Sequence, residues 1–306
     1  GYSNTKIINI KKAPPIVYSV GSNQYGQLGI GSYSDKHTIQ DIEFFYYYDI
    51  TITQIACGEK YTIFLASDGK VYGVGHNNVG QLGLGHEIFR QITIQEITFF
   101  NEIGITITQI ACGENHTIFL GSDGKVYGAG YNSHGELGIG SLTIGEDTIQ
   151  EITFFNDKNI KQIACGWNHA IFLASNDKLY SVGSNTYGQL GRSDTNPSYE
   201  IHEITFFNEN GITITQIACG SYQTTFLASN GKVYSVGRNN VGQLGLGHET
   251  TPQTTPQEIS YFNDKNITHI ACGKFYTSVY IQHPIWNISN KIKLYETTFD
   301  LEAFNY

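Results

Sequence analysis

The 306-residue chain contains no methionine and only three arginines, and charged residues make up only 15% of it. Because the initiator is missing, we expect Gly1 to follow a processed or trimmed start. Acidic residues outnumber basic ones by 27 to 18, and no basic run occurs. Nucleic-acid binding requires a positively charged footprint, so we expect no nucleic-acid partner.

Long apolar runs are also absent. A membrane span needs ~20 mostly apolar residues, so we expect none, and residues 1–10 lack the apolar segment of a signal peptide. Glycine, in contrast, is abundant: the chain has 34 glycines together with 21 tyrosines and 17 phenylalanines. This composition is typical of an all-β protein with many short strands and tight turns.

A unit of roughly 54 residues recurs along the chain, and two landmarks mark it. The first is a glycine-rich turn that follows a short apolar segment, and the second is the sequence Ile-Ala-Cys-Gly. The turn glycines are Gly21, Gly75, Gly130, Gly183 and Gly237. The landmark cysteines are Cys57, Cys112, Cys165, Cys219 and Cys272. Two landmarks with one period indicate five copies of a single structural unit.

Each unit predicts four strands, which in the second copy span residues 52–57, 61–66, 71–74 and about 94–100. We expect burial to fall from the first strand to the fourth, as in a propeller blade from axis to rim. The chain starts within one unit and ends within another. We therefore predict a single β-propeller of five four-stranded blades over residues 16–282, closed by pairing of its N- and C-terminal strands, which would remove two open sheet edges.

The repeat resembles the regulator of chromosome condensation repeat family. The resemblance rests on the turn Gly-x-Asn-x-x-Gly-Gln-Leu-Gly and on the motif Cys112-Gly113-Glu114-Asn115-His116-Thr117. It implies a propeller with an interaction role, which in the founding member is nucleotide exchange on a Ran-type small GTPase together with chromatin binding. This chain has five units where seven are usual, no inserted hairpin and no basic tail. A protein-binding scaffold without catalysis is therefore our leading hypothesis.

The repeated polar residues have structural explanations. One cysteine per unit, 53–55 residues apart, does not match the closely spaced ligands of a zinc site, so we interpret the five cysteines as small buried residues of the innermost strand in a reducing compartment. His116 and His169 share one position, to which we assign Tyr61, Tyr222 and Tyr276 in the other copies. A position that accepts His or Tyr fills space, so we expect no catalytic residue, no metal and no cofactor.

A binding site is expected where the copies differ. The loops after the glycine turn diverge, and their candidate partner-binding residues are His37, His86, Arg90, Arg192, Asp194 and His248. Equivalent loops of a propeller gather on one face around the axis. The connections into the first strands form a second set, in which Tyr46, Tyr47 and Tyr48 are exceptional, and exposed aromatic residues favour binding.

The ends of the chain, residues 1–15 and 283–306, do not belong to the repeat. Thr5 to Lys11 could add a strand, and Lys291 to Tyr295 alternate in polarity. The C-terminal tail could cover the closing blade or mediate self-association. Two functions stay open beside the scaffold: a guanine-nucleotide exchange factor for a small GTPase, and a structural component of a viral or other particle. We expect an intracellular protein, cytoplasmic or nuclear.

Overall fold

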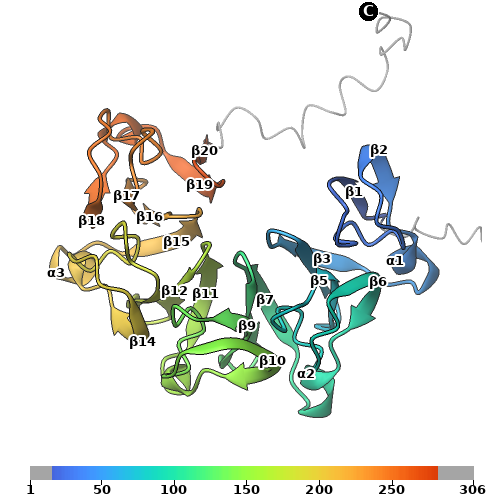
Figure 1. The fold of residues 1–306 in the computed structure, drawn as a ribbon. Helices are drawn as coiled ribbons and strands as arrows, with labels where there is room; N and C mark the ends of the chain where they lie inside the picture. Colours follow the sequence, from blue (N-terminus) through green and yellow to red (C-terminus); the bar gives the residue numbers. More distant parts are fainter. Residues whose placement is uncertain (1–15, 282–306) are drawn as a thin grey trace, which may run out of the picture.

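The computed structural model describes residues 16–281, and its main elements are antiparallel strands arranged as the blades of a propeller (Figure 1). The predicted strands of residues 1–15 and of the C-terminal tail lie outside the described residues. Four complete blades contain four strands each, and consecutive strands are neighbours in every sheet. The prediction of an all-β propeller is therefore confirmed.

The elements of the complete blades follow in chain order. The first complete blade contains β3 (Ile52–Cys57), β4 (Tyr61–Ala66), β5 (Val71–His76) and β6 (Arg90–Glu96). The second contains β7 (Ile107–Cys112), β8 (His116–Gly121), β9 (Val126–Asn132) and β10 (Thr143–Glu151). The third contains β11 (Ile160–Cys165), β12 (His169–Ala174), β13 (Leu179–Gly183) and β14 (Ser198–Glu203). The fourth contains β15 (Ile214–Cys219), β16 (Gln223–Ala228), β17 (Val233–Gly237) and β18 (Gln253–Glu258).

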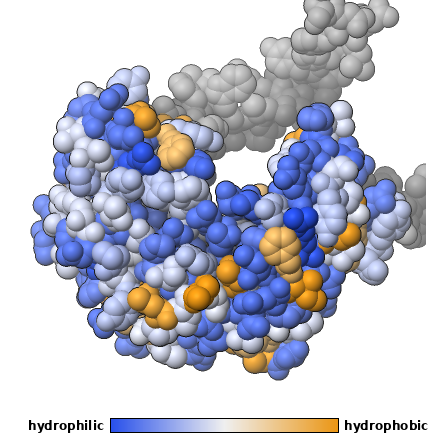
Figure 2. All heavy atoms as spheres, in the orientation of Figure 1, coloured by the Kyte–Doolittle hydropathy of each residue, from blue (hydrophilic) through white to orange (hydrophobic). Residues whose placement is uncertain are grey.

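Pairing of the N- and C-terminal strands, which the sequence predicts as the closure of the ring, is not detected among residues 16–281. Within these residues, β1 (Tyr18–Gly21) pairs with β2 (Lys36–Asp41), and β19 (Ile267–Cys272) pairs with β20 (Thr277–Ile281). These two-stranded sheets stand at opposite ends of an open arc, and the gap between them also remains in the space-filling view (Figures 1 and 2). The packing between neighbouring blades sets the rotation from one blade to the next. Over residues 16–281 the summed rotation leaves the first and last sheets apart (Figure 1).

Side chains at the open end are exposed where their equivalents within the arc are covered. Ile55 is 47% exposed, whereas Ile110 at the same position of the next blade is 1% exposed. Val20 of β1 is 52% exposed, whereas Val74 of β5 is fully buried. A groove of about 360 Å³ lies between β1 and the first complete blade, lined by residues that include Tyr18 and Ile55. Each blade thus depends on a preceding blade to cover its inner face.

Neighbouring blades are joined by apolar clusters and by side chains that bond across the interface. One cluster combines Ile63 and Leu65 of β4 with Phe119 of β8. The Gln54 side chain accepts a hydrogen bond from the Ile110 N–H (3.0 Å) and donates one to its carbonyl oxygen (2.9 Å). The same pair of bonds joins Gln109 to Ile163 in the next two blades. The repeat therefore encodes both the blade and the contact between blades.

The predicted fourth strand and the predicted burial gradient require correction. Residues after Glu96 form the one-turn helix α2 (Phe99–Glu102), because Ile97 and Phe100, three residues apart, both enter the core. Equivalent turns are α1 (Glu43–Tyr47), α3 (Phe206–Glu209) and the 3-10 turns Thr153–Phe155 and Ser260–Phe262. Burial is greatest in the second and third strands, whereas β3 alternates between half-buried and exposed residues because Ile55 and Cys57 line the groove beside β1.

The turn glycines have the backbone conformation that the sequence indicates. Gly75 has φ +109°, and a Cβ atom built on it would lie 2.6 Å from the carbonyl oxygen of Lys60. Only glycine satisfies both conditions without strain. The other four turn glycines also have φ between +100° and +115°. The structure also contains, among the residues it describes, no helix with the length and apolar character needed to cross a bilayer.

Candidate interaction face

Each blade has two ends, and the strand directions determine which loops share an end. The turns between first and second strands lie at the same end as the loops between third and fourth strands. We call this end of the propeller the turn face. His37, His86, Arg90, Arg192, Asp194 and His248 all lie on loops or strand starts at the turn face. Tyr46, Tyr47 and Tyr48 are exposed at the opposite end, on and just after α1.

The loops of the turn face are built on a buried asparagine that each copy provides. In the first complete blade, Asn77 Oδ1 accepts the Leu82 N–H (3.0 Å), and Asn77 Nδ2 donates to the His86 carbonyl oxygen (2.6 Å). Equivalent pairs of bonds are made by Asn23, Asn132, Asn185 and Asn239. This framework holds the variable residues of each loop at equivalent positions around the axis.

Several predicted binding residues take part in shaping their own loops. The ring Nδ1 of His86 accepts the Ile88 N–H, and the ring Nδ1 of His248 accepts the Thr250 N–H, both at 3.2 Å. The Arg192 guanidinium donates to the carbonyl oxygen of Asn196 (2.9 Å) and lies 3.8 Å from the Asp194 carboxylate. Arg90 is the predicted residue that presents an exposed charge to solvent beside aromatic rings.

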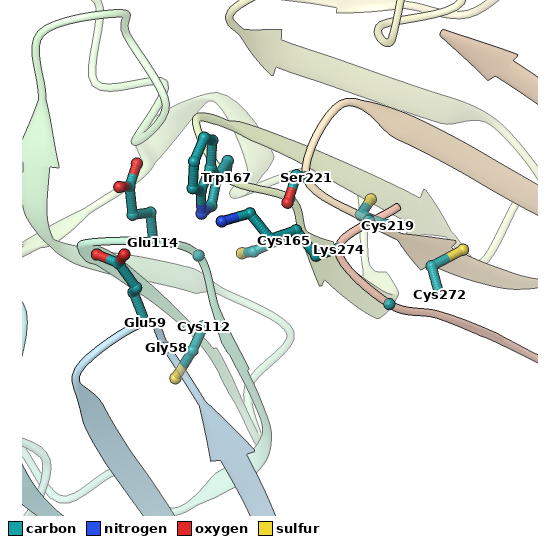
Figure 3. A pocket seen from close by; sticks show the side chains of 14 residues that line it. Gly58, Glu59, Cys112, Glu114, Cys165, Trp167, Cys219, Ser221, Cys272 and Lys274 are labelled. Atoms are coloured by element: carbon teal, nitrogen blue, oxygen red, sulfur yellow. The ribbon is translucent and has the colours of Figure 1, made fainter. Parts of the chain in front are cut away.

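The turns around the axis form a continuous rim. The backbone N–H of Glu59 donates to the carbonyl oxygen of Glu114 (3.2 Å), that of Glu114 to Trp167 (3.1 Å), and that of Trp167 to Ser221 (3.2 Å). Ser221 continues the series to Lys274 (3.4 Å). These five residues, each following Cys-Gly, line an opening of about 270 Å³. Figure 3 shows Glu59 and Glu114 close together, whereas Lys274 extends toward Trp167.

Four of the cysteines also line this opening, and all five are free thiols. They are therefore less covered than the buried role we predicted, since Cys57 is exposed and the others are half-buried. Burial nevertheless raises the pKa of Cys112 to about 12 and raises the pKa of Cys219. Thiols with raised pKa values are poor nucleophiles at neutral pH. Among the residues described, no group of three His, Cys, Asp or Glu side chains could hold a metal ion.

Two groups of aromatic rings surround an arginine on the turn face. The Arg238 cluster comprises Trp167, Tyr187, Tyr222, Arg238, Lys274 and Phe275. Its guanidinium carbon lies 5.0 Å from the ring centroid of Tyr187 and 5.5 Å from that of Tyr222. The Arg90 cluster comprises Tyr25, Tyr33, His76, Phe89 and Arg90, in which the guanidinium carbon lies 4.9 Å from the ring centroid of Phe89. Contacts of this kind hold a cation over a ring face.

Cations at the two ends of the blades have different surroundings. At the end opposite the turn face, four lysines that each precede a third strand form ion pairs with glutamates of the fourth strand. The pairs are Lys70–Glu96, Lys125–Glu151, Lys178–Glu203 and Lys232–Glu258, at 2.8–3.2 Å. The Lys232 ammonium holds the pKa of Glu258 below its ordinary value. Within residues 16–281, Arg90, Arg238 and Lys274 form no ion pair with a carboxylate.

The repeat position that His116 and His169 share lies inside the propeller, at the contact with the next blade. His169 Nε2 lies 3.1 Å from Thr224 Oγ1, and the Tyr61 hydroxyl donates to the His116 carbonyl oxygen. Burial lowers the pKa of His116 to about 4 and that of His169 to about 3. The assignment of Tyr222 to this position is wrong, because Gln223 occupies it and donates to Gly273 and Tyr276 carbonyl oxygens. Fully buried side chains here cannot meet a substrate.

Sequence reasoning missed the Arg238 cluster. It singled out the loops after the glycine turn, but the cluster is formed mainly by the short turns after Cys-Gly. A usable signal was present, because the residue after Cys-Gly is different in almost every copy: Glu59, Glu114, Trp167, Ser221 and Lys274. Variation at one place within a repeated turn marks a position that the scaffold does not constrain.

Comparisons with known proteins agree on the architecture. The family model described as the RCC1-like domain matches residues 16–283. The chain is 34% identical over 259 residues to the ultraviolet-B receptor UVR8 of Arabidopsis thaliana, covering 84% of this chain and 56% of that protein. It is 33% identical over 289 residues to the X-linked retinitis pigmentosa GTPase regulator of Mus musculus, covering 78% of this chain and 28% of that protein. The chain thus spans about half or less of these relatives.

Solved structures show the same fold. Human WBSCR16 superposes with a TM-score of 0.75 at 24% identity, covering 87% of this chain and 67% of that one. Prp20p from Saccharomyces cerevisiae, described together with its binding to Gsp1p and histones, gives a TM-score of 0.75 at 22% identity and covers 89% of this chain and 65% of that one. The open arc seen here corresponds to about two thirds of each of these chains.

Proposed function

Because this chain belongs to the RCC1-like domain family, we propose that it is a non-catalytic scaffold that binds a protein partner through the turn face. The observation that carries the proposal is the pair of arginine–aromatic clusters on the turn face. Both consist of residues that differ between copies, and both stand on a framework that every copy repeats. A shared framework with divergent residues on one face is suited to recognition.

The composition of the clusters supports binding. Aromatic residues and arginine are enriched in the cores of protein interfaces and among the residues whose truncation costs most affinity. Stacking on rings restricts the arginine side chains before a partner arrives, so less conformational entropy is lost on binding. At the opposite end, four lysines are paired with glutamates, and the cation–ring contacts there, Lys158 with Phe154 and Lys265 with Tyr261, are single pairs rather than clusters.

Affinity capture with matched variants tests the proposal. The test variant carries Arg90→Ser and Arg238→Ser, both on the turn face. The control carries Lys70→Ser and Lys232→Ser, which remove two cations from the opposite end of the same two blades. We expect the wild type and the control to recover one shared set of partners, and the test variant to lose it. Equal recovery by both variants would refute binding through the turn face.

A second candidate function is guanine-nucleotide exchange on a small GTPase. The match to the mouse protein named a GTPase regulator favours it, as does the fold shared with yeast Prp20p, which is described as binding Gsp1p. Release of a fluorescent guanine nucleotide from a panel of small GTPases decides it, since an exchange factor accelerates release at catalytic concentration and a scaffold does not. The similar proteins named above lend no support to incorporation into a particle.

A further inference from the structure

We propose that the Arg238 cluster binds an acidic peptide segment of the partner, with carboxylates meeting Arg238 and Lys274 and an apolar side chain packing on the exposed edge of Phe275. This inference rests on the proposed function and specifies the chemistry of the partner. Five segments supply the cluster: the β11–β12, β15–β16 and β19–β20 turns, the loop after β13, and the start of the loop after β17.

Arg238 is held in place while much of its hydrogen-bonding capacity remains. Its Nε donates to the Asn240 side-chain oxygen at 2.7 Å, and its guanidinium lies over the rings of Tyr187, Tyr222 and Phe275 at 5.0–5.7 Å. For its terminal nitrogens, residues 16–281 provide neither an ion pair nor a hydrogen bond. A guanidinium fixed in this way is suited to bidentate contact with a carboxylate.

Lys274 provides a second cation next to the first. Its ammonium lies 4.4 Å from the ring centroid of Trp167 and 5.6 Å from that of Phe275, and the residue is exposed. The Phe275 ring is next to both cations, since its centroid lies 5.7 Å from the Arg238 guanidinium carbon and 5.6 Å from the Lys274 ammonium. Two cations without a carboxylate partner, both beside a partly exposed ring, match a peptide in which acidic residues flank an apolar one.

The next turns of the rim limit the length of that segment. Glu59 and Glu114 project there, with Glu114 in the turn next to Trp167. Burial followed by the nearby Glu59 charge raises the pKa of Glu114, and the Lys60 and Lys274 charges partly offset this rise (Figure 3). An acidic peptide that continued across the opening would meet like charge. We therefore expect the acidic stretch to end at the opening.

Single-stranded nucleic acid, another anionic ligand, fits the cluster less well. Base stacking requires free ring faces, but the guanidinium already covers ring faces of Tyr187 and Tyr222. The rings of Trp167 and Tyr222 also meet edge to face, with centroids 5.1 Å apart. The net charge of −9 opposes a polyanion. An acidic peptide needs only the two local cations.

Fluorescence anisotropy with the full chain tests this proposal. The probes are a labelled peptide containing Asp-Glu-Leu-Asp-Glu, the same peptide with Asn and Gln in place of the acids, one with Lys, and a single-stranded oligonucleotide. We expect the acidic peptide to bind at least tenfold more tightly than the neutral one, and more weakly as salt rises. Arg238→Glu and Lys274→Glu should each weaken it about tenfold or more, and the double variant should favour the Lys peptide.

Lys232→Glu is the matched control, because Lys232 precedes β17 and Arg238 follows it, at opposite ends of one strand. It should leave acidic-peptide affinity unchanged, and circular dichroism should show that every variant is folded. Equal binding of the acidic and neutral peptides, tighter binding of the oligonucleotide, or insensitivity to Arg238→Glu would overturn the proposal. If partner capture still depends on Arg90 and Arg238 while acidic peptides fail to bind, the scaffold function stands and this inference fails. If partner capture does not depend on Arg90 and Arg238, and acidic peptides also fail to bind, both the scaffold function and this inference are refuted.

Discussion

A pair of alanine substitutions at one repeat position distinguishes an open arc from a closed ring. Ile55 and Ile110 occupy equivalent places in the first strands of neighbouring blades, but Ile55 is 47% exposed and Ile110 is 1% exposed. Ile110 is covered by the preceding blade, whose Gln54 side chain bonds to its backbone. Ile55 instead lines the open groove beside β1.

The exposures set the expected magnitudes. Replacing a buried isoleucine with alanine costs about 2–5 kcal/mol, because apolar contact is lost and a cavity remains. Ile110→Ala should therefore reduce the free energy of unfolding by about 3 kcal/mol. Ile55→Ala removes a side chain that is already half in water, so we expect a loss of about 1 kcal/mol or less.

Guanidinium-induced unfolding of both variants, followed by tryptophan fluorescence and circular dichroism, measures the difference. The two variants should unfold with similar slopes and clearly separated midpoints. Equal losses of about 3 kcal/mol would show that Ile55 is covered in solution, either by β20 closing the ring or by another molecule. That result would refute the open arc.

Three further predictions concern polar side chains that differ in burial. Asn77→Ala should lower the free energy of unfolding by about 2–3 kcal/mol, because a fully buried side chain loses two hydrogen bonds. Asn78→Ala at the exposed neighbouring position should change this free energy little, and thermal denaturation compares the two variants. Burial lowers the pKa of His169 from 6.5 to about 3. The fold therefore keeps the full contribution of neutral His169 above pH 6.5 and loses it progressively as the pH falls from 6.5 toward 3. His169→Gln, which mimics Gln223, should flatten this loss of stability, and an unchanged pH profile would contradict its assignment to His169. Exposed Cys57 should react with a thiol reagent well before Cys112, whose raised pKa suppresses the thiolate; simultaneous labelling in mass spectra would contradict this order.

Local pattern predicted the strands but not every boundary. The bounds predicted for the first two strands of the second copy agree with β3 and β4, because turn residues mark both ends of each. The fourth strand was extended too far, because Ile97 and Phe99 suggested alternation. In the structure Phe100 enters the core instead, which requires a helical turn. A two-residue period and a three-residue period cannot be distinguished in so short a segment.

The closure and the site depended on quantities that a repeat does not encode. Equal spacing along a chain shows that blades repeat, but the angle between blades follows from side-chain packing, for example of Ile63 and Leu65 against Phe119. Arg238 was visible as one of three arginines, yet the four aromatic rings of its cluster come from turns and loops up to 108 residues apart, from Trp167 to Phe275. Only the fold brings them together.

Hydrogen–deuterium exchange of the chain with and without its captured partner tests the central claim most directly. Binding through the turn face predicts slower exchange in peptides that contain the turns at residues 58–60, 113–115, 220–222 and 273–275. Peptides that contain residues 46–48 and 67–70, at the opposite end, should exchange at the same rate in both states. Protection confined to the opposite end, with the turn face unchanged, would contradict the account.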